Sequence, residues 1–326
     1  MRAAYYEANG SAREVLKLGD VETPEPGPGE VRVRLHTSGV NPSDVKTRAG
    51  TARKMAFPRV IPHSDGAGEI DRVGEGVPAS RLGERVWTWN AGWKRAFGTA
   101  AEHVVLPEKQ AVRLPDAASF EDGACLGIPA LTAYHAVTID GSVEGQTLLV
   151  SGGAGAVGHY VVQFAKAKGA TVLTTISSDE KAEHARAAGA DHTINYRSED
   201  VAERVKAITG ERGVDRVIEM DIAANAGLLP GIIAPKGTVV IYGTGAPHAQ
   251  IPSGFCLTNG IALKFFLVYE LDWELRKAAI AEINRMIDGN QLQHAIGPTF
   301  ALDRIAEAHE AVESGRTIGN VVVRLS

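Results

Sequence analysis

The sequence predicts an α/β protein made of a β-rich part and a doubly wound parallel sheet. Its 326 residues exceed the length at which one hydrophobic core usually stops growing, so two domains are expected. Up to about residue 120, short apolar runs are separated by glycine and proline, which is typical of β-strands and turns. From about residue 145, strand patterns alternate with helix patterns, which indicates βαβ units and a parallel sheet.

The β-rich part contains alternating or apolar runs such as residues 31–35 and 103–106. Segment 23–30, TPEPGPGE, has the composition of a turn. It is too short, and too closely flanked by strand patterns, to separate two domains. We therefore expect it to connect two strands.

The parallel sheet begins at residues 147–150, TLLV, an apolar run without polar alternation, as expected of a strand buried on both faces. A glycine loop follows, and then a helix with Val157, Val161 and Phe164 at helical spacing, which Gly169 ends. Further strands are expected at 171–176, 216–219 and 238–242, with helices at 179–188 and from about 199 to 210.

After an apolar run at 262–268, the pattern predicts three more elements. They are an amphipathic helix at 274–287, a shorter helix at 304–312 and a closing strand at 320–325. Periodicity does not indicate where these elements pack.

The glycine loop satisfies a dinucleotide-binding pattern, G-x-G-x-x-G, between a buried strand and a helix. Its first glycine is expected to make the tight turn, its second to let backbone N–H groups approach a pyrophosphate, and Gly158 to let the helix pack on the strand. The residues expected to bind the cofactor here are Gly153, Ala154, Gly155, Ala156 and Val157.

The end of the second strand favours NADPH over NADH. An acid there would bind the 2′-hydroxyl of the adenosine ribose, but the strand ends in Ser177 and Ser178. Asp179 and Glu180 follow in the first turn of the next helix, where acids are favoured in any case. Lys181 can reach back toward a 2′-phosphate, for which the small serine side chains leave room.

Composition excludes several classes of protein. The net charge of −5, without a basic cluster, argues against nucleic acid as a partner. No apolar run reaches the roughly 18 residues that span a bilayer, and the first residues, MRAAYYEANG, lack the pattern of a secretory signal. Two cysteines cannot form a disulfide framework or a cysteine-rich zinc lobe. A cytoplasmic location is expected.

Several motifs together resemble the quinone oxidoreductase and zeta-crystallin branch of the medium-chain dehydrogenase/reductase superfamily. The resemblance extends from the first strand to the last. Its markers are GVNPSD at 39–44, PHSDGAG at 62–68, GIPALTAY at 127–134, the glycine loop, INYR at 194–197, VIEM at 217–220 and AEAHE at 306–310.

The resemblance implies a GroES-like catalytic domain formed by residues 1–124 and 269–326, with a Rossmann NADPH-binding domain at 125–268 between them. It also implies an active site in the cleft between the domains. A homodimer or homotetramer is expected, associating through an edge of the Rossmann sheet.

The zinc-dependent relatives have a catalytic cysteine where this chain has Asn41, and a zinc-ligand histidine where it has Ser64. His63 is one position away from the lost ligand, and a single histidine without further donors is not a zinc site. We therefore expect no metal.

The resemblance also implies site residues. Asn41 would contact the cofactor ribose or the substrate oxygen, Thr132 would lie against the nicotinamide, and Lys181 and Tyr196 would hold the 2′-phosphate. The backbone around Tyr242, Gly243, Phe265, Phe266 and Leu267 is expected to line the nicotinamide pocket, and Asn320 to close the cleft.

Lys46 departs from the branch, which usually has tyrosine at this position, whereas zinc alcohol dehydrogenases have a proton-relay histidine. The lysine is either a solvent-facing side chain or a third catalytic residue beside Asn41 and Thr132, acting as proton donor or anion anchor.

The function expected from the resemblance is hydride transfer from NADPH to a quinone or other conjugated carbonyl, such as an enone. One alternative is a reductase of enoyl thioesters or alkenals. Another is an NADPH-binding structural protein with little catalysis.

Overall fold

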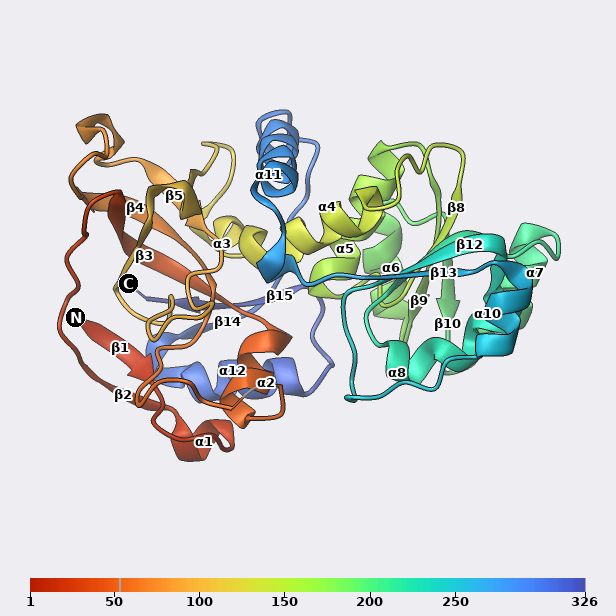
Figure 1. Ribbon diagram of the computed structural model, residues 1–326, viewed down its shortest axis with the longest axis horizontal. Helices are drawn as coiled ribbons and strands as arrows, with labels where there is room; N and C mark the ends of the chain where they lie inside the picture. The colour runs from red at the N-terminus through yellow and green to blue at the C-terminus, as the bar shows by residue number, and fades with distance from the viewer. Residues whose placement is uncertain (53, 326) are drawn as a thin grey trace. The chain divides into compact units, whose positions relative to one another are not determined.

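The computed structural model describes residues 1–52 and 54–325 (Figure 1). The chain divides into two compact units, here called the terminal unit (Met1–Pro129 and Ile280–Ser326) and the central unit (Ala130–Ala279). The terminal unit is therefore discontinuous in sequence and the central unit is inserted into it. These limits differ by several residues from the domain limits expected above, and the functional domain division stays a prediction.

The terminal unit is built on a mainly antiparallel sheet in the strand order β14-β15-β3-β4-β5-β7, with β6 paired to β3. In its middle, β15 from the end of the chain pairs with β3 from the beginning, with Val322 opposite Gly39. The strands of this unit are β1 (Arg2–Tyr5), β2 (Lys17–Asp20), β3 (Glu30–Val40), β4 (Asp65–Val73), β5 (Arg85–Thr88), β6 (His103–Pro107), β7 (Ala111–Arg113), β14 (Ile296–Ala301) and β15 (Asn320–Arg324).

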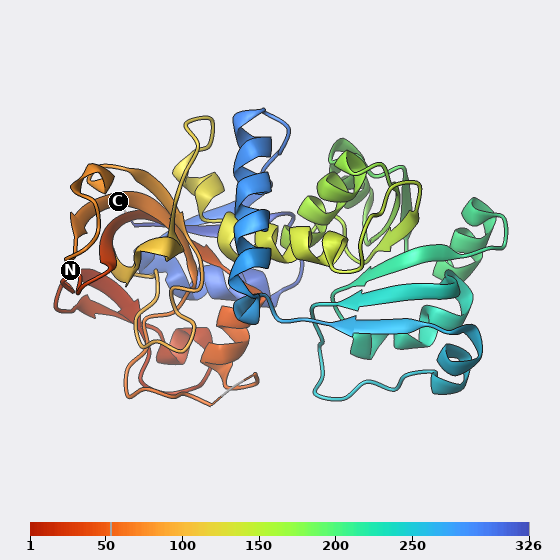
Figure 2. The same cartoon turned by 45° about the horizontal axis from the view of Figure 1, so that its top comes forward.

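Helix α2 (Pro42–Ala49) follows β3 directly and was not predicted. Asn41 is its N-cap residue, Pro42 occupies the first turn, and Gly50 ends the helix with a φ of 79°. The other helices that contribute to this unit are α1 (Ala12–Val15), α3 (Phe120–Gly123), α12 (Ile305–Glu313) and the second half of α11 (Trp273–Asp288), which is blue in Figure 2.

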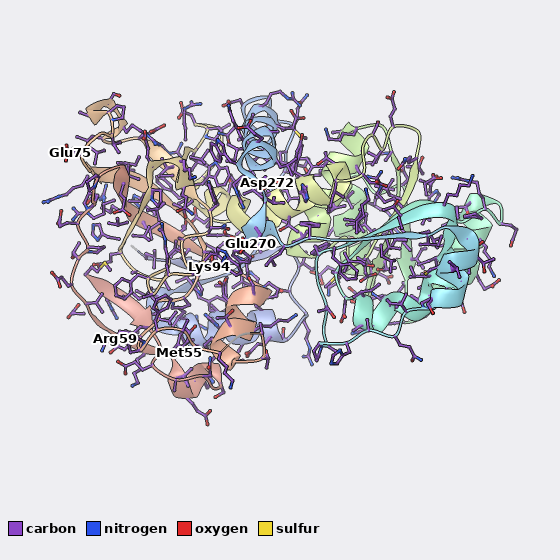
Figure 3. The ribbon with its side chains drawn as sticks, viewed as in Figure 1. Met55, Arg59, Glu75, Lys94, Glu270 and Asp272 are labelled. Carbon is purple, nitrogen blue, oxygen red and sulfur yellow. The ribbon has the colours of Figure 1, made fainter. Side chains whose placement is uncertain are left out.

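Loops of the terminal unit are held by charged and aromatic side chains, several of which are labelled in Figure 3. Arg59 pairs with Glu7 at 2.7 Å and lies 4.5 Å from the centre of the Tyr5 ring. In the loop after β5, the Lys94 ammonium lies 5.4 Å from the Trp93 ring. These contacts are on the surface, so we expect each to contribute little to stability.

The central unit is a parallel sheet in the strand order β10-β9-β8-β11-β12-β13. The chain enters at β8, builds outward to β10, and then crosses to build the other half of the sheet. Its strands are β8 (Thr147–Val150), β9 (Thr171–Ile176), β10 (His192–Asn195), β11 (Val214–Glu219), β12 (Ile233–Ile241) and β13 (Ala262–Phe265). The reversal between β8 and β11 is the switch point at which such sheets bind ligands, beyond the carboxyl ends of the strands.

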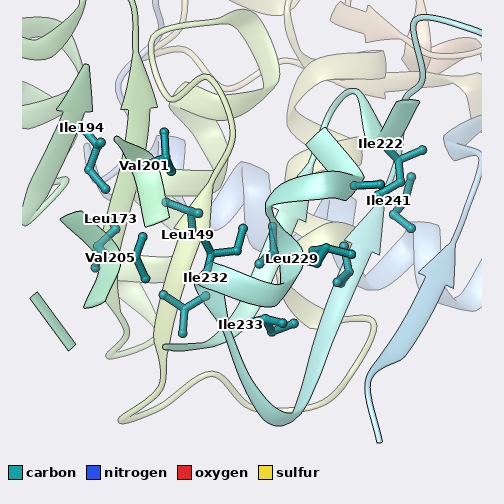
Figure 4. Packing of buried hydrophobic residues seen from close by; sticks show 14 residues of the cluster. Leu149, Leu173, Ile194, Val201, Val205, Ile222, Leu229, Ile232, Ile233 and Ile241 are labelled. Atoms are coloured by element: carbon teal, nitrogen blue, oxygen red, sulfur yellow. The ribbon is translucent and has the colours of Figure 1, made fainter. Parts of the chain in front are cut away.

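Helices cover both faces of this sheet (Figure 1). On one face, Val205, Ile222 and Leu229 pack against strand residues such as Leu149 and Leu173, which Figure 4 shows from close by. The helices of the unit are α4 (Leu131–Thr138), α5 (Ala156–Ala167), α6 (Asp179–Ala187), α7 (Val201–Thr209), α8 (Ile222–Asn225), α9 (Leu229–Ile232), α10 (Ser253–Asn259) and the first half of α11.

The predicted fold class is confirmed, and strands β8 and β9 begin and end at the predicted residues. The predicted strand at 238–242 instead begins at Ile233, because Pro235-Lys236-Gly237 resembles a turn but forms an irregularity inside the strand, with Lys236 at a φ of 65°. The short strands β10 and β14 were not predicted. Among the described residues, no helix is both long enough and apolar enough to cross a membrane.

Candidate cofactor and active site

The glycine loop joins β8 to α5 at the carboxyl edge of the central sheet. Gly152 has a φ of 70°, so the tight turn expected at Gly153 is made one residue earlier. Gly153 is needed for another reason. A Cβ at this position would lie 2.3 Å from Thr174 Oγ1 on β9, which accepts a hydrogen bond from the Gly153 N–H at 2.8 Å.

The start of α5 is open to a ligand. Gly155 is the N-cap residue, and no side chain caps the helix. A Cβ at Gly155 would meet only the Gly152 oxygen, at 3.3 Å, whereas a Cβ at Gly158 would lie 2.2 Å from the same oxygen. Because the first N–H groups of a helix have no acceptor within the helix, this loop fits the pyrophosphate of a dinucleotide.

Ser177, Lys181 and Tyr196 lie at the carboxyl end of the neighbouring strands β9 and β10. Ser178 caps α6 and accepts a hydrogen bond from the Lys181 N–H at 3.3 Å. The Tyr196 N–H donates to the Ile176 carbonyl at 3.2 Å, and the Tyr196 side chain is 52% exposed. Lys181 forms no ion pair with the described residues. This edge therefore offers a cation and a phenol that fit a phosphate.

Arg197 is a further cation at this edge that the sequence analysis did not name. It is exposed, and its backbone N–H donates to Asn195 Oδ1 at 3.1 Å in the turn after β10. Its position within the marker 194–197, next to Tyr196, was the available signal.

Glu219, at the end of β11, was also missed. It is buried and accepts hydrogen bonds from Ser151 Oγ at 2.6 Å and from Asn225 Nδ2 at 3.0 Å. Ser151 follows β8 and begins the glycine loop, so Glu219 ties the loops after β8 and β11 together at the switch point. The signal was the acid that closes an otherwise apolar strand, in the marker 217–220.

Thr132, Tyr242 and Gly243 lie in the central unit, as the nicotinamide position requires. Thr132 is buried in α4, and its Oγ1 has no hydrogen-bond partner among the described residues, which fits a ligand group at this point. Burial, and to a lesser degree Glu219, raise the pKa of Tyr242. A Cβ at Gly243 would lie 2.2 Å from the Met220 oxygen, so close backbone packing requires glycine here.

Phe266 continues from β13 and packs inward. Its ring meets the His135 ring edge to face at 4.7 Å, and its N–H donates to the Ile241 carbonyl at 3.2 Å. Burial, and then Arg276, lower the pKa of His135, which keeps this imidazole neutral at pH 7. The flanking side chains are exposed: Phe265 at 64% and Leu267 at 48%.

In the terminal unit, Asn41 lies against Asp65, which the sequence analysis did not name as a site residue. Asn41 Nδ2 donates to Asp65 Oδ2 at 2.8 Å, and the Ile128 N–H donates to the same oxygen at 3.0 Å. Burial, and then the nearby Asp44 carboxylate, raise the pKa of Asp65 well above its usual range. The signal for Asp65 was its place in the marker 62–68.

His63 and Ser64 are both buried beside this pair. His63 Nδ1 lies 2.8 Å from Ser38 Oγ, and its Nε2 lies 2.9 Å from His309 Nε2. Burial lowers the pKa of His63 to about 3. Within residues 1–52 and 54–325, no group of three or more His, Cys, Asp or Glu side chains could hold a metal ion.

Asn320 and Lys46 are the other residues of the terminal unit that were predicted to belong to the site. Val321 on β15 pairs with Val40, the last residue of β3, so Asn320 at the start of β15 is one position beyond this pair on one strand and Asn41 directly follows the other. Asn320 Nδ2 donates to the Ala295 carbonyl at 3.1 Å. Lys46 is exposed on α2, five residues after Asn41.

Two family models match the chain. The model described as the alcohol dehydrogenase GroES-like domain matches residues 27–116, in the terminal unit. The model described as zinc-binding dehydrogenase matches residues 156–285, mostly in the central unit. The matches confirm the predicted combination of a GroES-like domain with a Rossmann-like parallel sheet.

Relatives match over nearly the full length. Quinone oxidoreductase of Sus scrofa is 31% identical over 305 residues, which are 93% of this chain and 91% of the relative. The 2-haloacrylate reductase of Burkholderia sp is 30% identical over 315 residues, which are 93% of each chain.

Solved structures of known proteins also superpose on this chain over its full length. An NAD-dependent alcohol dehydrogenase superposes with a TM-score of 0.92 at 30% identity, covering all of both chains. Quinone oxidoreductase of Escherichia coli complexed with NADPH superposes with a TM-score of 0.88 at 25% identity, again over all of both chains. The second agrees with the cofactor predicted from the sequence.

Identity of 30% or more over nine tenths of the chain reflects common descent as well as a common fold. The chain belongs to the medium-chain dehydrogenase/reductase family, in its quinone oxidoreductase branch, and is an oxidoreductase.

Proposed function

We propose that the protein transfers hydride from NADPH to a quinone or another conjugated carbonyl compound, without zinc. The observation that carries the proposal is that the chain has a dinucleotide cradle at the start of α5 and has Asn41, an amide, where zinc-dependent relatives have a ligand cysteine. NADPH, when bound, supplies the hydride. The residues of the chain bind and orient the reactants and exclude water.

In the central unit, the residues 153–157 would hold the pyrophosphate through backbone N–H groups at the start of α5. Lys181 and Tyr196 would hold the 2′-phosphate, and Ser177 leaves room for it because its side chain is small. No acid ends β9, so an adenosine ribose with a free 2′-hydroxyl gains no carboxylate partner there. These features support NADPH over NADH, although one similar structure is an NAD-dependent enzyme.

The nicotinamide would lie beside Thr132, whose unpartnered Oγ1 fits a carboxamide or ribose group. Tyr242, Gly243 and residues 265–267 would form the wall, mainly through their backbone. In the terminal unit, Asn41 would orient the acceptor oxygen or a ribose hydroxyl, and Asn320, on the neighbouring strand, would close the site.

The donor set supports a zinc-free reaction. Asn41 and Ser64 are poor zinc ligands beside cysteine and histidine, and both ring nitrogens of His63 already have neighbours within hydrogen-bonding distance. Without a Lewis acid, a simple ketone or alcohol is a demanding substrate. A conjugated acceptor needs less polarisation because it delocalises the charge that arrives with the hydride.

A second function, reduction of the double bond in an enoyl thioester, an alkenal or a related conjugated acid, is favoured by one specific finding. The chain is as similar to a 2-haloacrylate reductase as to several quinone oxidoreductases. Lys46, an exposed residue of α2, would bring a positive charge that suits an anionic acceptor. A protein that binds NADPH with little catalysis is the third reading.

We further propose that two or four copies associate through β13, one of the two edge strands of the central sheet, whose unpaired side can accept another strand. Light scattering on the purified protein would measure the assembly. A charged substitution at an exposed position of this edge, Ala262→Asp, should shift it toward monomer, and a wild-type monomer would contradict the proposal. The cytoplasmic location stays a prediction.

One assay separates the three functions. Purified protein with NADPH is offered a neutral quinone, an alkenal, a haloacrylate and an enoyl thioester, and NADPH oxidation is followed. Quinone turnover above the others supports the first function, and preference for the double-bond substrates supports the second. NADPH binding without turnover of any acceptor would support the third. Elemental analysis should find substoichiometric zinc in the active enzyme, and stoichiometric zinc whose removal abolishes turnover would overturn the metal-free mechanism.

A further inference from the structure

We propose that Asp65 is the positioning residue of the reaction, and that it acts by fixing the direction of the Asn41 side-chain amide. This inference rests on the proposed hydride transfer, in which Asn41 orients the acceptor. It assigns a role to a carboxylate at the start of β4 that the resemblance left without one.

The direction of the Asn41 amide is usually difficult to assign, because its oxygen and nitrogen are similar in shape. Here a backbone group settles it. The Ile128 N–H can only donate, so Asp65 Oδ2 accepts at this contact, 3.0 Å away. The same oxygen lies 2.8 Å from the Asn41 amide, which therefore presents its nitrogen to Asp65.

This arrangement holds whether or not Asp65 carries a proton. The Ile128 N–H donates to Oδ2, and a carbonyl oxygen is a stronger acceptor than a hydroxyl oxygen, so a proton would be carried by Oδ1, which has no partner among the described residues. In both states Oδ2 remains an acceptor for Asn41. The amide oxygen of Asn41, and its second N–H, are then always presented in the same direction.

The carboxylate cannot turn away from this contact. A Cβ at Gly127 would lie 2.3 Å from Asp65 Oδ1, so the Gly127 backbone closes over that oxygen. Asn41 is held equally well, because it is the N-cap residue of α2 and its N–H donates to Asp44 Oδ2 at 2.8 Å. Both partners are therefore anchored by backbone.

Stability alone does not account for an acid at this position. Asp65 is 0% exposed and no cation pairs with it among the described residues, and one of its oxygens is unpartnered. A buried carboxylate of this kind costs stability, and Asp44 adds repulsion. A leucine of similar shape in its place would bury no charge, but it would offer Asn41 no acceptor. The oxygen at this position is therefore what sets the direction of the Asn41 amide.

The test is a double-mutant cycle with Asp65→Leu and Asn41→Ala, measured on the acceptor that wild type reduces best. Asp65→Leu should lower kcat about tenfold, the equivalent of about one hydrogen bond, because the Asn41 amide is then no longer held in one direction. Asp65→Asn should keep most of the activity, because the Ile128 N–H keeps the oxygen of the new amide in the place of Oδ2. The KM for NADPH should stay within about twofold, since the proposed nucleotide contacts are in the central unit. In the Asn41→Ala background, Asp65→Leu should cost nothing further in kcat.

A structural role predicts other results. Asp65→Leu would then lower kcat by the same factor in both backgrounds, which would overturn the proposal. Asp65→Asn should retain activity and unfold at an equal or higher temperature, because a buried charge is removed; a loss of activity in Asp65→Asn equal to that in Asp65→Leu would also overturn the proposal.

Asp71→Asn is the matched control. Asp71 lies on the same strand and pairs with Arg32 at 2.8 Å, so this variant should lose stability without a change in kcat. If wild type reduces no acceptor at all, both this inference and the proposed function fail. If wild type is active and the cycle is additive, only the inference on Asp65 fails.

Discussion

The candidate residues of the two units are held in place in different ways. In the central unit, the candidate cofactor site consists largely of backbone: a glycine loop, a helix start and the ends of parallel strands. In the terminal unit, the candidate residues are side chains that meet across long sequence separations, such as Asn41 with Asp65 and His63 with His309, 246 residues apart. A site made of backbone corresponds to one short glycine pattern in the sequence, whereas a site made of side chains corresponds to single residues far apart in the sequence. Cofactor binding is therefore easier to predict here than acceptor choice.

The largest expected effect comes from filling the backbone site. Gly153→Val would place carbon atoms into Thr174 Oγ1, which is 2.3 Å from the position of a Cβ. Overpacking of this kind should disfavour the loop conformation that binds NADPH by about 1–3 kcal/mol, so the Kd for NADPH should rise roughly 10–100-fold. Titration by NADPH fluorescence would measure it.

Gly155→Ala is the control for this prediction, because its Cβ would meet only one oxygen, at 3.3 Å. It should weaken binding less than Gly153→Val. If both variants bind NADPH like wild type, the loop is not the cofactor site and the comparison between the units fails.

The next effect concerns cofactor preference. One charge-assisted contact to a 2′-phosphate, from Lys181, is worth about 1.5–3 kcal/mol and should favour NADPH over NADH by one to two orders of magnitude in kcat/KM. Lys181→Ala should remove most of this preference and leave NADH use little changed. Steady-state kinetics with both cofactors would measure the ratio.

Lys206→Ala is a suitable control, because Lys206 lies on α7 and pairs with Glu203 at 3.0 Å. It should leave the ratio unchanged. If Lys181→Ala lowers kcat/KM equally with NADPH and NADH, then Lys181 contacts the pyrophosphate that both cofactors share, or it stabilises the fold.

The third prediction probes the side-chain network of the terminal unit through pH. Burial lowers the pKa of His63 to about 3, from 6.5 in the unfolded chain. Between these values the unfolded state binds more protons, so the free energy of unfolding should fall as pH falls from 6.5 toward 3. The slope for one such group is up to about 1.4 kcal/mol per pH unit.

Denaturant unfolding at a series of pH values would measure this slope. His63→Gln should reduce it, whereas His192→Gln, a change at an exposed position on β10, should not. A slope that is the same in wild type and His63→Gln would show that the buried imidazoles do not control acid stability.

The smallest expected effect concerns Lys46. Lys46→Tyr restores the residue usual in the branch. It should raise kcat/KM for a neutral quinone, relative to kcat/KM for a carboxylated or thioester acceptor, by a few-fold. This is the effect expected of one exposed charge worth about 0.2–1 kcal/mol. The ratio of kcat/KM for the two acceptors would measure it. If both acceptors change equally, or neither changes, Lys46 is a solvent-facing side chain.

Local patterns predicted the parallel sheet well, because a buried strand such as 147–150 and a helix ended by Gly169 depend on neighbouring residues. They failed where a local signal is misleading, as at Pro235-Lys236-Gly237, which continues a strand. They also could not join β3 to β15, because no local pattern records a partner at the other end of the chain; only the family resemblance supplied it.

The same contrast applies to the candidate site: residues in a local pattern were predicted, whereas residues brought together by the fold were not. Gly153 was found from spacing, although the turn itself is at Gly152. Asp65 and Glu219 were missed, because an acid at a strand end is common and its burial becomes evident only when β8, β11 and α2 are in place. For Lys46, the sequence identified a departure from the family, but its effect depends on the acceptor.

The pairing of β15 with β3 has a consequence during protein synthesis. At about 5–20 residues per second, β3 emerges from the ribosome on the order of tens of seconds before its partner strand. The central unit has all its strands by residue 265 and can fold in that interval, while the edge of β3 remains open to other chains. Nascent chains are therefore most exposed to misassembly just before the last strand is made.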